Sequence, residues 1–213
     1  MESKIRDLRQ EIFKFEQLSN FDKNDFFVSE CNYFAFNLIK SWPNWEKKIL
    51  NIYGERKSGK SHLSEIFLEK KKGVKFKLKD LNKKIFDRIR EYENIVIEDF
   101  NERCDEEAAY SLIDMVEKEN KYLLITSVRA VNEMETRLKD LNSRFKNILT
   151  AKIDKPDDEL IHALIVKNFS DNQIILDKKL INFICKRIAR SYDKISEFIC
   201  TIDEISLKKK KTY

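Results

Sequence analysis

Apolar residues follow two alternating patterns along the first two thirds of the chain. Short segments typical of strands occur at 49–53, 74–78, 94–100, 122–127 and 148–153; apolar and charged residues alternate in 74–78, and the others contain short apolar runs. Between and before them, apolar residues recur every three or four positions, which predicts helices at 30–42, 60–71, 81–92, 106–119 and 130–142. The segments "NIVI" and "YLLI" contain the continuous apolar runs that are expected for strands covered on both faces. The pattern therefore predicts an α/β fold with a five-stranded parallel sheet and helices on both faces.

The strand pattern stops after Pro156. Residues 157–170, 177–189 and 192–207 each show the spacing of an amphipathic helix. We therefore expect a nucleotide-binding base at 30–155 and a small three-helix domain with a basic tail at 156–213. Residues 1–29 carry scattered aromatic residues without clean periodicity, and we interpret them as an N-terminal arm.

Two of the three glycines of the chain lie in "GERKSGKS", residues 54–61. This segment follows a predicted strand, precedes a predicted helix and matches the P-loop pattern, in which backbone N–H groups surround phosphate oxygens. A Cβ at Gly54 or Gly59 would obstruct that approach. The pattern predicts that Lys60 reaches the phosphates and that Ser61 helps to hold Mg²⁺. The neighbouring Ser58 and His62 complete the predicted nucleotide-binding segment.

The strand at 94–100 ends in two acids, as a P-loop protein requires. Glu98 takes the place in which an aspartate usually holds the metal ion, so we predict that it contacts the nucleotide-bound Mg²⁺ with Ser61. Asp99 takes the place of the acid that orients the attacking water. Glutamate adds one methylene to the metal contact, which predicts weak hydrolysis at most.

Composition narrows the class of protein only slightly. The chain has 213 residues, a formal net charge of +5 and 37% charged residues, so its surface is dense in ions of both signs. The four cysteines form no C-x-x-C pair, which argues against zinc and against a disulfide framework. The N-terminus has no apolar signal segment and no apolar run approaches 18 residues, so we expect a cytoplasmic protein without a membrane partner.

Several segments together resemble one family. Besides the P-loop and "IVIEDF", they are "LLITS", "RLKDLNSRF", "KIDKPDDELIHALI" and "RIARSYDKISEFICTIDEISL". These are similar to the AAA+ ATPases of the bacterial replication initiator DnaA, and most of all to the short Hda-type regulators. The resemblance runs from about residue 10 to residue 207 and implies that ADP or ATP binds with Mg²⁺ under a lid formed by the last three helices.

The resemblance also implies roles for single residues. Thr126 and Ser127 would form the sensor-1 region near the γ-phosphate, although the aspartate that often follows in the family is Val128 here. Arg144, in "SRF", would be an arginine finger that reaches the nucleotide of a neighbouring subunit, where a guanidinium stabilises the transition state.

The sensor-2 residue of the lid is left open by the resemblance. The usual register places Asp193 where the family carries an arginine, and the flanking Arg190 and Lys194 are the two candidates for a basic group at the nucleotide.

Hda-type proteins begin with a short peptide that binds the replicative sliding clamp, the β subunit of DNA polymerase III. By position, Gln10, Phe13 and Phe15 are the expected clamp-binding residues, with "QLSNF" at 17–21 as the second candidate. The aromatic residues could alternatively fold back onto the base.

The function implied by the resemblance is regulation of replication initiation. The protein would bind the clamp and promote hydrolysis of the ATP held by DnaA. It would form a homodimer, because two arms binding one ring-shaped clamp gain affinity by avidity. No helix-turn-helix pattern follows the lid, so no sequence-specific DNA binding is expected. An alternative is an adaptor or helicase-loader-like protein that binds single-stranded DNA, which would need basic and aromatic residues on one exposed face. A small-molecule P-loop kinase is a third hypothesis, which the "SRF" segment and the three-helix tail disfavour.

Overall fold

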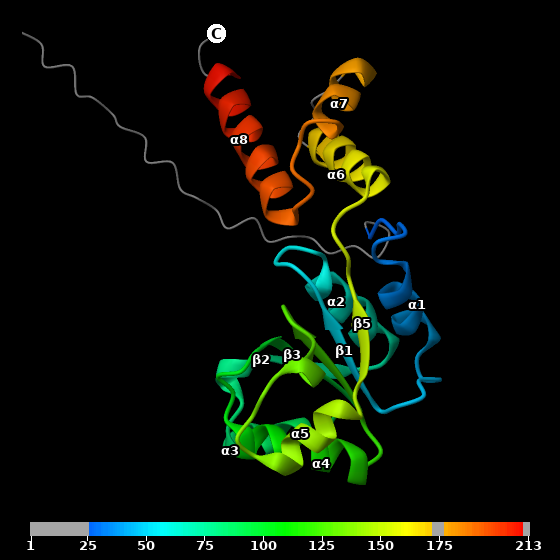
Figure 1. Ribbon diagram of the computed structural model, residues 1–213, viewed down its shortest axis with the longest axis vertical. Helices are drawn as coiled ribbons and strands as arrows, with labels where there is room; N and C mark the ends of the chain where they lie inside the picture. Colours follow the sequence, from blue (N-terminus) through cyan, green and yellow to red (C-terminus); the bar gives the residue numbers. More distant parts are fainter. Residues whose placement is uncertain (1–25, 172–176, 211–213) are drawn as a thin grey trace, which may run out of the picture.

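A computed structural model describes residues 26–171 and 177–210. Its five strands are β1 (Ile49–Tyr53), β2 (Gly73–Lys77), β3 (Asn94–Phe100), β4 (Tyr122–Ser127) and β5 (Leu149–Lys152). All neighbouring strands are parallel, and their order in the sheet is β2-β3-β4-β1-β5. The predicted α/β fold with a five-stranded parallel sheet is confirmed (Figure 1).

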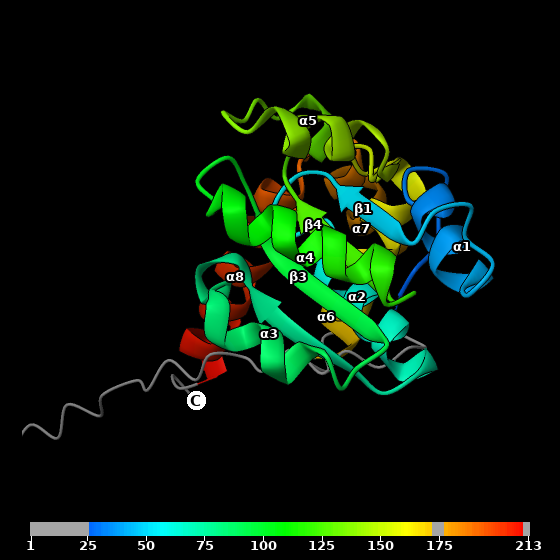
Figure 2. The ribbon, with the colours of Figure 1, turned by 90° about the horizontal axis from the view of Figure 1, so that it is seen from below.

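Helices cover both faces of this sheet. Helices α1 (Tyr33–Ser41) and α2 (Lys60–Lys70) pack on one face, and α3 (Lys83–Ile89), α4 (Glu106–Lys118) and α5 (Lys139–Lys146) on the other (Figures 1 and 2). Neighbouring strand residues alternate between the two cores: Ile49 belongs to the core under α4, and Leu50 to the core under α2. Each such side chain stabilises the fold by roughly 1.5–3 kcal/mol when it is fully buried. The apolar runs therefore reflect burial on both sides.

The helix predicted at 130–142 is wrong over 130–138, and only 139–142 belong to a helix, α5. The structure has a short 3₁₀ turn, η3 (Val131–Glu133), then irregular backbone up to α5. Side chains from other elements take the N–H groups that a helix would use: Asn51 Oδ1 accepts from Val131 N at 3.0 Å, and the Glu106 carboxylate accepts from Arg137 N and Leu138 N at 3.0 and 2.8 Å. Because these acceptors lie far away in sequence, local periodicity does not reveal them. A second short 3₁₀ turn, η2 (Leu78–Asp80), follows β2.

The last three helices form a separate small bundle with its own core. They are α6 (Asp158–Asp171), α7 (Lys178–Cys185) and α8 (Tyr192–Lys210), close to the predicted ranges. Their shared core contains Ile161, Ile165, Phe169, Ile181 and Ile195. Figure 1 shows this bundle, here called the lid, on the side of the base where the loop between β1 and α2 lies.

One polar junction ties the lid to the base. The Tyr192 hydroxyl, at the start of α8, donates to Asp154 O at 3.1 Å and lies 3.5 Å from Cys31 Sγ. Asp154 N in turn donates to Cys31 O at 2.9 Å. Burial raises the pKa of Tyr192, so its hydroxyl stays protonated and able to donate at neutral pH. The junction joins three segments that are far apart in sequence.

Three further observations concern the described ranges. The four cysteines, Cys31, Cys104, Cys185 and Cys200, are all free thiols. Within 26–171 and 177–210, no three His, Cys, Asp or Glu side chains gather in a way that could hold a metal ion. None of the helices in this part of the chain combines the length and apolar character needed to cross a bilayer.

Candidate functional site: a P-loop cavity between base and lid

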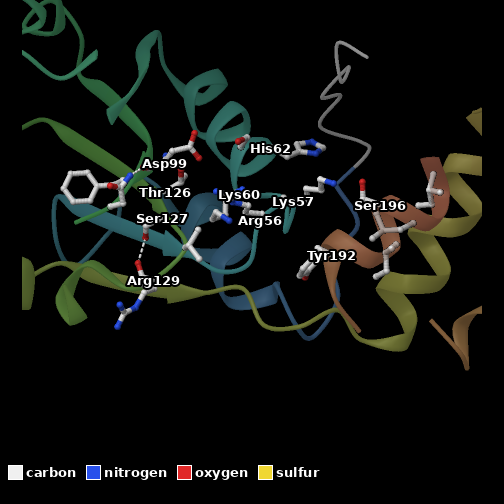
Figure 3. A pocket seen from close by; sticks show the side chains of 18 of the residues that line it. Arg56, Lys57, Lys60, His62, Asp99, Thr126, Ser127, Arg129, Tyr192 and Ser196 are labelled. Atoms are coloured by element: carbon white, nitrogen blue, oxygen red, sulfur yellow. Dashed lines mark hydrogen bonds between the residues drawn. The ribbon is translucent and has the colours of Figure 1, made fainter. Parts of the chain in front are cut away.

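A cavity of about 1130 Å³ lies between the base and the lid. Its walls are the loop between β1 and α2, the ends of β3 and β4 with the loops that follow, and inward faces of α6 and α8. In Figure 3 the loop residues stand between the strand ends on one side and the lid on the other. The volume is ample for a nucleotide, because ligand sites commonly measure about 300–1,000 Å³.

Both glycines of the loop are required by their surroundings. A Cβ on Gly54 would lie 2.7 Å from Ile153 O, a backbone atom that cannot move aside cheaply. Gly59 caps α2 with φ +92°, a left-handed conformation that side chains rarely adopt, and a Cβ there would lie 3.1 Å from the Phe26 ring. The first N–H groups of α2 have no acceptor within the helix, so the loop offers donors and a positive helix end to an anion.

Lys60 is held tightly against this loop. Its Nζ donates to Gly54 O at 2.8 Å, to Glu55 O at 2.6 Å and to Ser58 Oγ at 3.4 Å. Burial lowers the pKa of Lys60, while the charges of Asp99 and Glu55 act in the opposite direction. Its oxygen partners in the loop are neutral. A phosphate would supply the ammonium with a formally charged acceptor, which makes a stronger hydrogen bond.

The opposite wall holds Asp99 and Thr126. Asp99 has φ +58°, is exposed, and lines the cavity. Its N–H donates to the Thr126 hydroxyl at 3.4 Å. Ser127 is 1% exposed, and its hydroxyl accepts from Asn51 Nδ2 at 2.8 Å and donates to Arg129 O at 2.6 Å (Figure 3). Both hydrogen bonds of the Ser127 hydroxyl are thus made within the protein, whereas the Thr126 hydroxyl accepts one from Asp99, the acid that lines the cavity with Lys60.

The two acids at the end of β3 point in different directions. A register shift between Ile97 and Phe100 turns Asp99 toward the cavity. Glu98 is 8% exposed and does not line it; its Oε2 lies 3.9 Å from Lys75 Nζ, and its buried Oε1 has no hydrogen-bond partner within the described residues. The predicted contact of Glu98 with a nucleotide-bound Mg²⁺ is therefore not seen. Asp99 and Ser61 do line the cavity, and their oxygens are hard ligands of the kind that Mg²⁺ prefers, so these two residues fit a magnesium nucleotide.

The lid wall of the cavity is mainly apolar. The first half of α8 contributes Tyr192, Ile195, Ser196 and Ile199. Next to them, Asp193 Oδ1 lies 3.5 Å from Nζ of Lys57 in the P-loop, and both side chains are about half exposed. This ion pair joins the lid directly to the P-loop. In sequence, the spacing of 192, 195 and 199 shows only one apolar helix face and does not show that this face turns toward the loop.

Comparison with known proteins identifies the fold. No protein-family model matches the chain. It is 26% identical to the chromosomal replication initiator protein DnaA of Aliarcobacter butzleri (strain RM4018), over 205 aligned positions that include 84% of this chain and 47% of that protein. The chain thus spans about half the length of this relative.

Solved structures of DnaA have a similar fold. Domain III of the Thermotoga maritima replication initiation protein DnaA superimposes with a TM-score of 0.67 at 18% identity, covering 91% of this chain and 90% of that one. The replication initiator DnaA bound to AMPPCP and single-stranded DNA gives a TM-score of 0.66 at 16% identity, covering 88% and 67%. The chain has the fold of a DnaA-like AAA+ domain.

Neither sensor-2 candidate of this DnaA-like domain lines the cavity. Arg190 pairs with Asp158 at 2.9 Å, and Lys194 pairs with Glu197 at 2.7 Å, within its own helix. The lid residue that contacts the P-loop is Asp193. The direction of each side chain on α8 depends on how the lid packs, which the sequence does not show.

Arg144 lies on α5, remote from the cavity of its own DnaA-like domain. Its guanidinium donates to Asp114 at 2.9 Å and to Glu117, both on α4, and stacks on the Tyr110 ring with 4.8 Å between Cζ and the ring centre. A hydrogen bond to Tyr110, then the two carboxylates, raise the pKa of Arg144 despite partial burial. The structure therefore assigns this arginine a set of partners that the sequence did not indicate.

The predicted clamp-binding residues Gln10, Phe13 and Phe15, and the alternative segment 17–21, lie outside the described residues. Phe26 is one of the aromatic residues at 1–29 and is the first of the described residues. The Phe26 ring stacks on Phe36 at 5.6 Å and meets His62 edge-on at 5.2 Å. His62 lines the cavity, so the start of the described chain forms part of the support of the P-loop helix.

Proposed function

We propose that this chain is an Hda-like regulator of replication initiation that binds adenine nucleotide and promotes hydrolysis of ATP held by DnaA. The observation that carries the proposal is the P-loop cavity, in which Lys60 faces Asp99 and the lid covers the phosphate loop. The similarity to DnaA, including a structure with bound AMPPCP, supports an adenine nucleotide as the ligand.

Each wall of the cavity has a defined task in this proposal. Lys60 and the first amides of α2 bind the phosphates of ADP or ATP. Ser61 and Asp99, which both line the cavity, would hold Mg²⁺, whereas Glu98 does not line it. Bound Mg²⁺ would neutralise phosphate charge. The apolar face of α8 excludes water from the bound nucleotide.

Arg144 is the group proposed to act on the ATP of DnaA. It lies on the surface of α5, outside its own cavity, as a residue that serves a neighbouring subunit must. Its side chain is 24% exposed and held by Asp114 and Glu117. To reach a phosphate, Arg144 would exchange these carboxylates for phosphate oxygens. Both groups are anionic and accept paired hydrogen bonds from a guanidinium.

Substitution of Arg144 tests this role. In an assay of DnaA-bound ATP turnover with DNA-loaded clamp, we expect the wild-type chain to stimulate hydrolysis and Arg144→Ala to reduce that stimulation by about tenfold or more, because arginine fingers contribute strongly to phosphoryl transfer. Nucleotide affinity of the variant should stay unchanged, since Arg144 does not line the cavity. Absence of stimulation by the wild-type chain would contradict the proposed function itself.

Two further variants separate this role from a structural one. Asp114→Asn combined with Glu117→Gln removes the same ion pairs while keeping Arg144, so it should retain stimulation even if it melts at a lower temperature. Arg137→Ala, an exposed arginine just before α5, is the matched control and should behave as wild type. Equal loss in the acid variant would mean that Arg144 only joins α4 to α5.

The proposed clamp contact belongs to the N-terminal arm. Phe13→Ala with Phe15→Ala should weaken binding of the full chain to the sliding clamp by about tenfold, because aromatic anchors supply most of the affinity of such peptides. Phe21→Ala is the comparison that decides between the two candidate peptides. Surface plasmon resonance on immobilised clamp measures both, and loss of binding only with Phe21→Ala would move the site to residues 17–21.

A further inference from the structure

Helix α7 and the turn after it present an unusual combination of exposed charge and exposed rings. Residues 178–190 contain five basic residues and no acidic one, in a chain with 42 basic and 37 acidic residues. These five are Lys178, Lys179, Lys186, Arg187 and Arg190, and all are exposed. Arg190 pairs with Asp158, whereas no ion pair involves the three lysines within the described part of the chain.

The aromatic component lies on the same surface. Leu180 and Phe183 are 46% and 52% exposed, and the Arg187 guanidinium carbon lies 3.8 Å from the centre of the Phe183 ring. Positions 180, 183 and 187 follow one another along one face of the helix and its extension. Ile181 points the other way, into the lid core with Ile165. The exposed face is therefore not needed to hold the lid together.

The lysines of another lysine-rich stretch, next to and on β2, can be explained without a ligand. Lys71 and Lys75, on or next to the edge strand β2, pair with Glu93 and with Glu65 and Glu98. Lysines on an edge strand also prevent pairing with other sheets, which explains them without a ligand. The lysines on and after α7 neither pair with carboxylates of the described residues nor lie on a sheet edge.

We propose that this face, defined by Lys179, Leu180, Phe183, Lys186 and Arg187, binds single-stranded nucleic acid. A ring with a guanidinium packed over it offers flat surfaces on which an unpaired base can stack, and the flanking lysines attract the phosphate backbone. Duplex DNA keeps its bases stacked and cannot use the ring. An acidic protein is the competing occupant of this face, and the competition experiment below distinguishes the two. The proposal is independent of the nucleotide cavity, because none of these five residues lines it.

Fluorescence anisotropy with a labelled oligodeoxythymidylate and the full chain tests the proposal. We expect binding that weakens as salt is raised, because phosphate contacts release counterions. Phe183→Ala should weaken binding about tenfold, and Phe183→Trp should preserve it, since stacking on one aromatic ring contributes substantially to each base contact. Lys179→Glu with Lys186→Glu should weaken binding further and reduce the salt dependence.

Two control variants outside the proposed face test whether binding depends on this face. Phe34→Ala removes an equally exposed ring from α1, and Lys70→Glu reverses a charge in the other lysine-rich stretch; both should bind as wild type. The proposal is overturned by lack of binding at low salt, by equal losses in Phe34→Ala and Phe183→Ala, or by equal competition from duplex DNA. Competition by polyglutamate that depends on Phe183 to the same extent would also overturn it, in favour of an acidic protein partner. Circular dichroism of each variant confirms that the lid is folded.

Discussion

Replacing Lys60 by alanine should lower the affinity for ADP and ATP by at least about 100-fold. Hydrogen bonds to charged groups are worth about 1.5–3 kcal/mol each, so loss of two phosphate contacts corresponds to that factor. Lys60 is already buried in the folded protein, and burial lowers its pKa, so nucleotide binding adds little further free-energy cost for desolvating this side chain. Isothermal titration calorimetry with ADP and with AMPPCP, each with Mg²⁺, measures the change.

Lys70→Ala is the matched control for this result. It removes the same side chain from the last turn of the same helix, where the residue is exposed and remote from the cavity. We expect it to bind nucleotide as the wild type does. Lys60 also holds the carbonyls of Gly54 and Glu55, so the melting temperature of both variants should be recorded. Unchanged affinity in Lys60→Ala would show that the cavity is not a phosphate site.

Asn51→Leu should destabilise the base by about 3 kcal/mol. Asn51 is completely buried on β1; its Nδ2 donates to Ile125 O and to Ser127 Oγ, and its Oδ1 accepts from Val131 N. Leucine has a similar size but leaves these groups without their partner, and each buried unsatisfied polar group costs about 1–3 kcal/mol. Urea unfolding followed by tryptophan fluorescence measures the loss, because Trp42 and Trp45 both pack in the base against Phe67.

The same substitution at an exposed asparagine gives the control. Asn132 lies next to Val131 in η3 and is exposed, so Asn132→Leu should change stability by no more than about 0.5 kcal/mol. If the two variants unfold at the same urea concentration, the buried network around Asn51 does not carry the stability assigned to it. The Asn51 variant should also bind nucleotide more weakly, since the network fixes the end of β4 at the cavity wall.

The strands and the P-loop could be predicted because their signals are local. Burial on both faces gives a strand a continuous apolar run, and the predicted bounds of β1, β3 and β4 equal the observed ones for that reason. The P-loop was found from eight consecutive residues between a strand and a helix. The same reasoning failed at 130–142, because acceptors from Asn51 and Glu106 displaced the helix that the apolar spacing suggested.

The candidate site was predicted less completely than the fold. Glu98 and Asp99 are adjacent in sequence, yet a shift in strand register sends only Asp99 into the cavity. Asn51, which donates a hydrogen bond to Ser127, carried no signal because a single asparagine in an apolar run has no motif. The carboxylates around Arg144 are 30 and 27 positions away from it, so nothing local marks them.

The amino-acid sequence alone determined the alternation of strands and helices, the P-loop motif between β1 and α2, and the change to an all-helical segment after Pro156. These depend on the order and polarity of neighbouring residues, which directly govern local conformation and burial. Only the tertiary structure decided which acid lines the cavity with Lys60, that an ion pair of Asp193 joins the lid to the P-loop, and that Arg144 is bound to α4. Those outcomes depend on strand register and on the packing of elements distant in sequence, since the direction of a side chain is fixed only when its element is packed against the others.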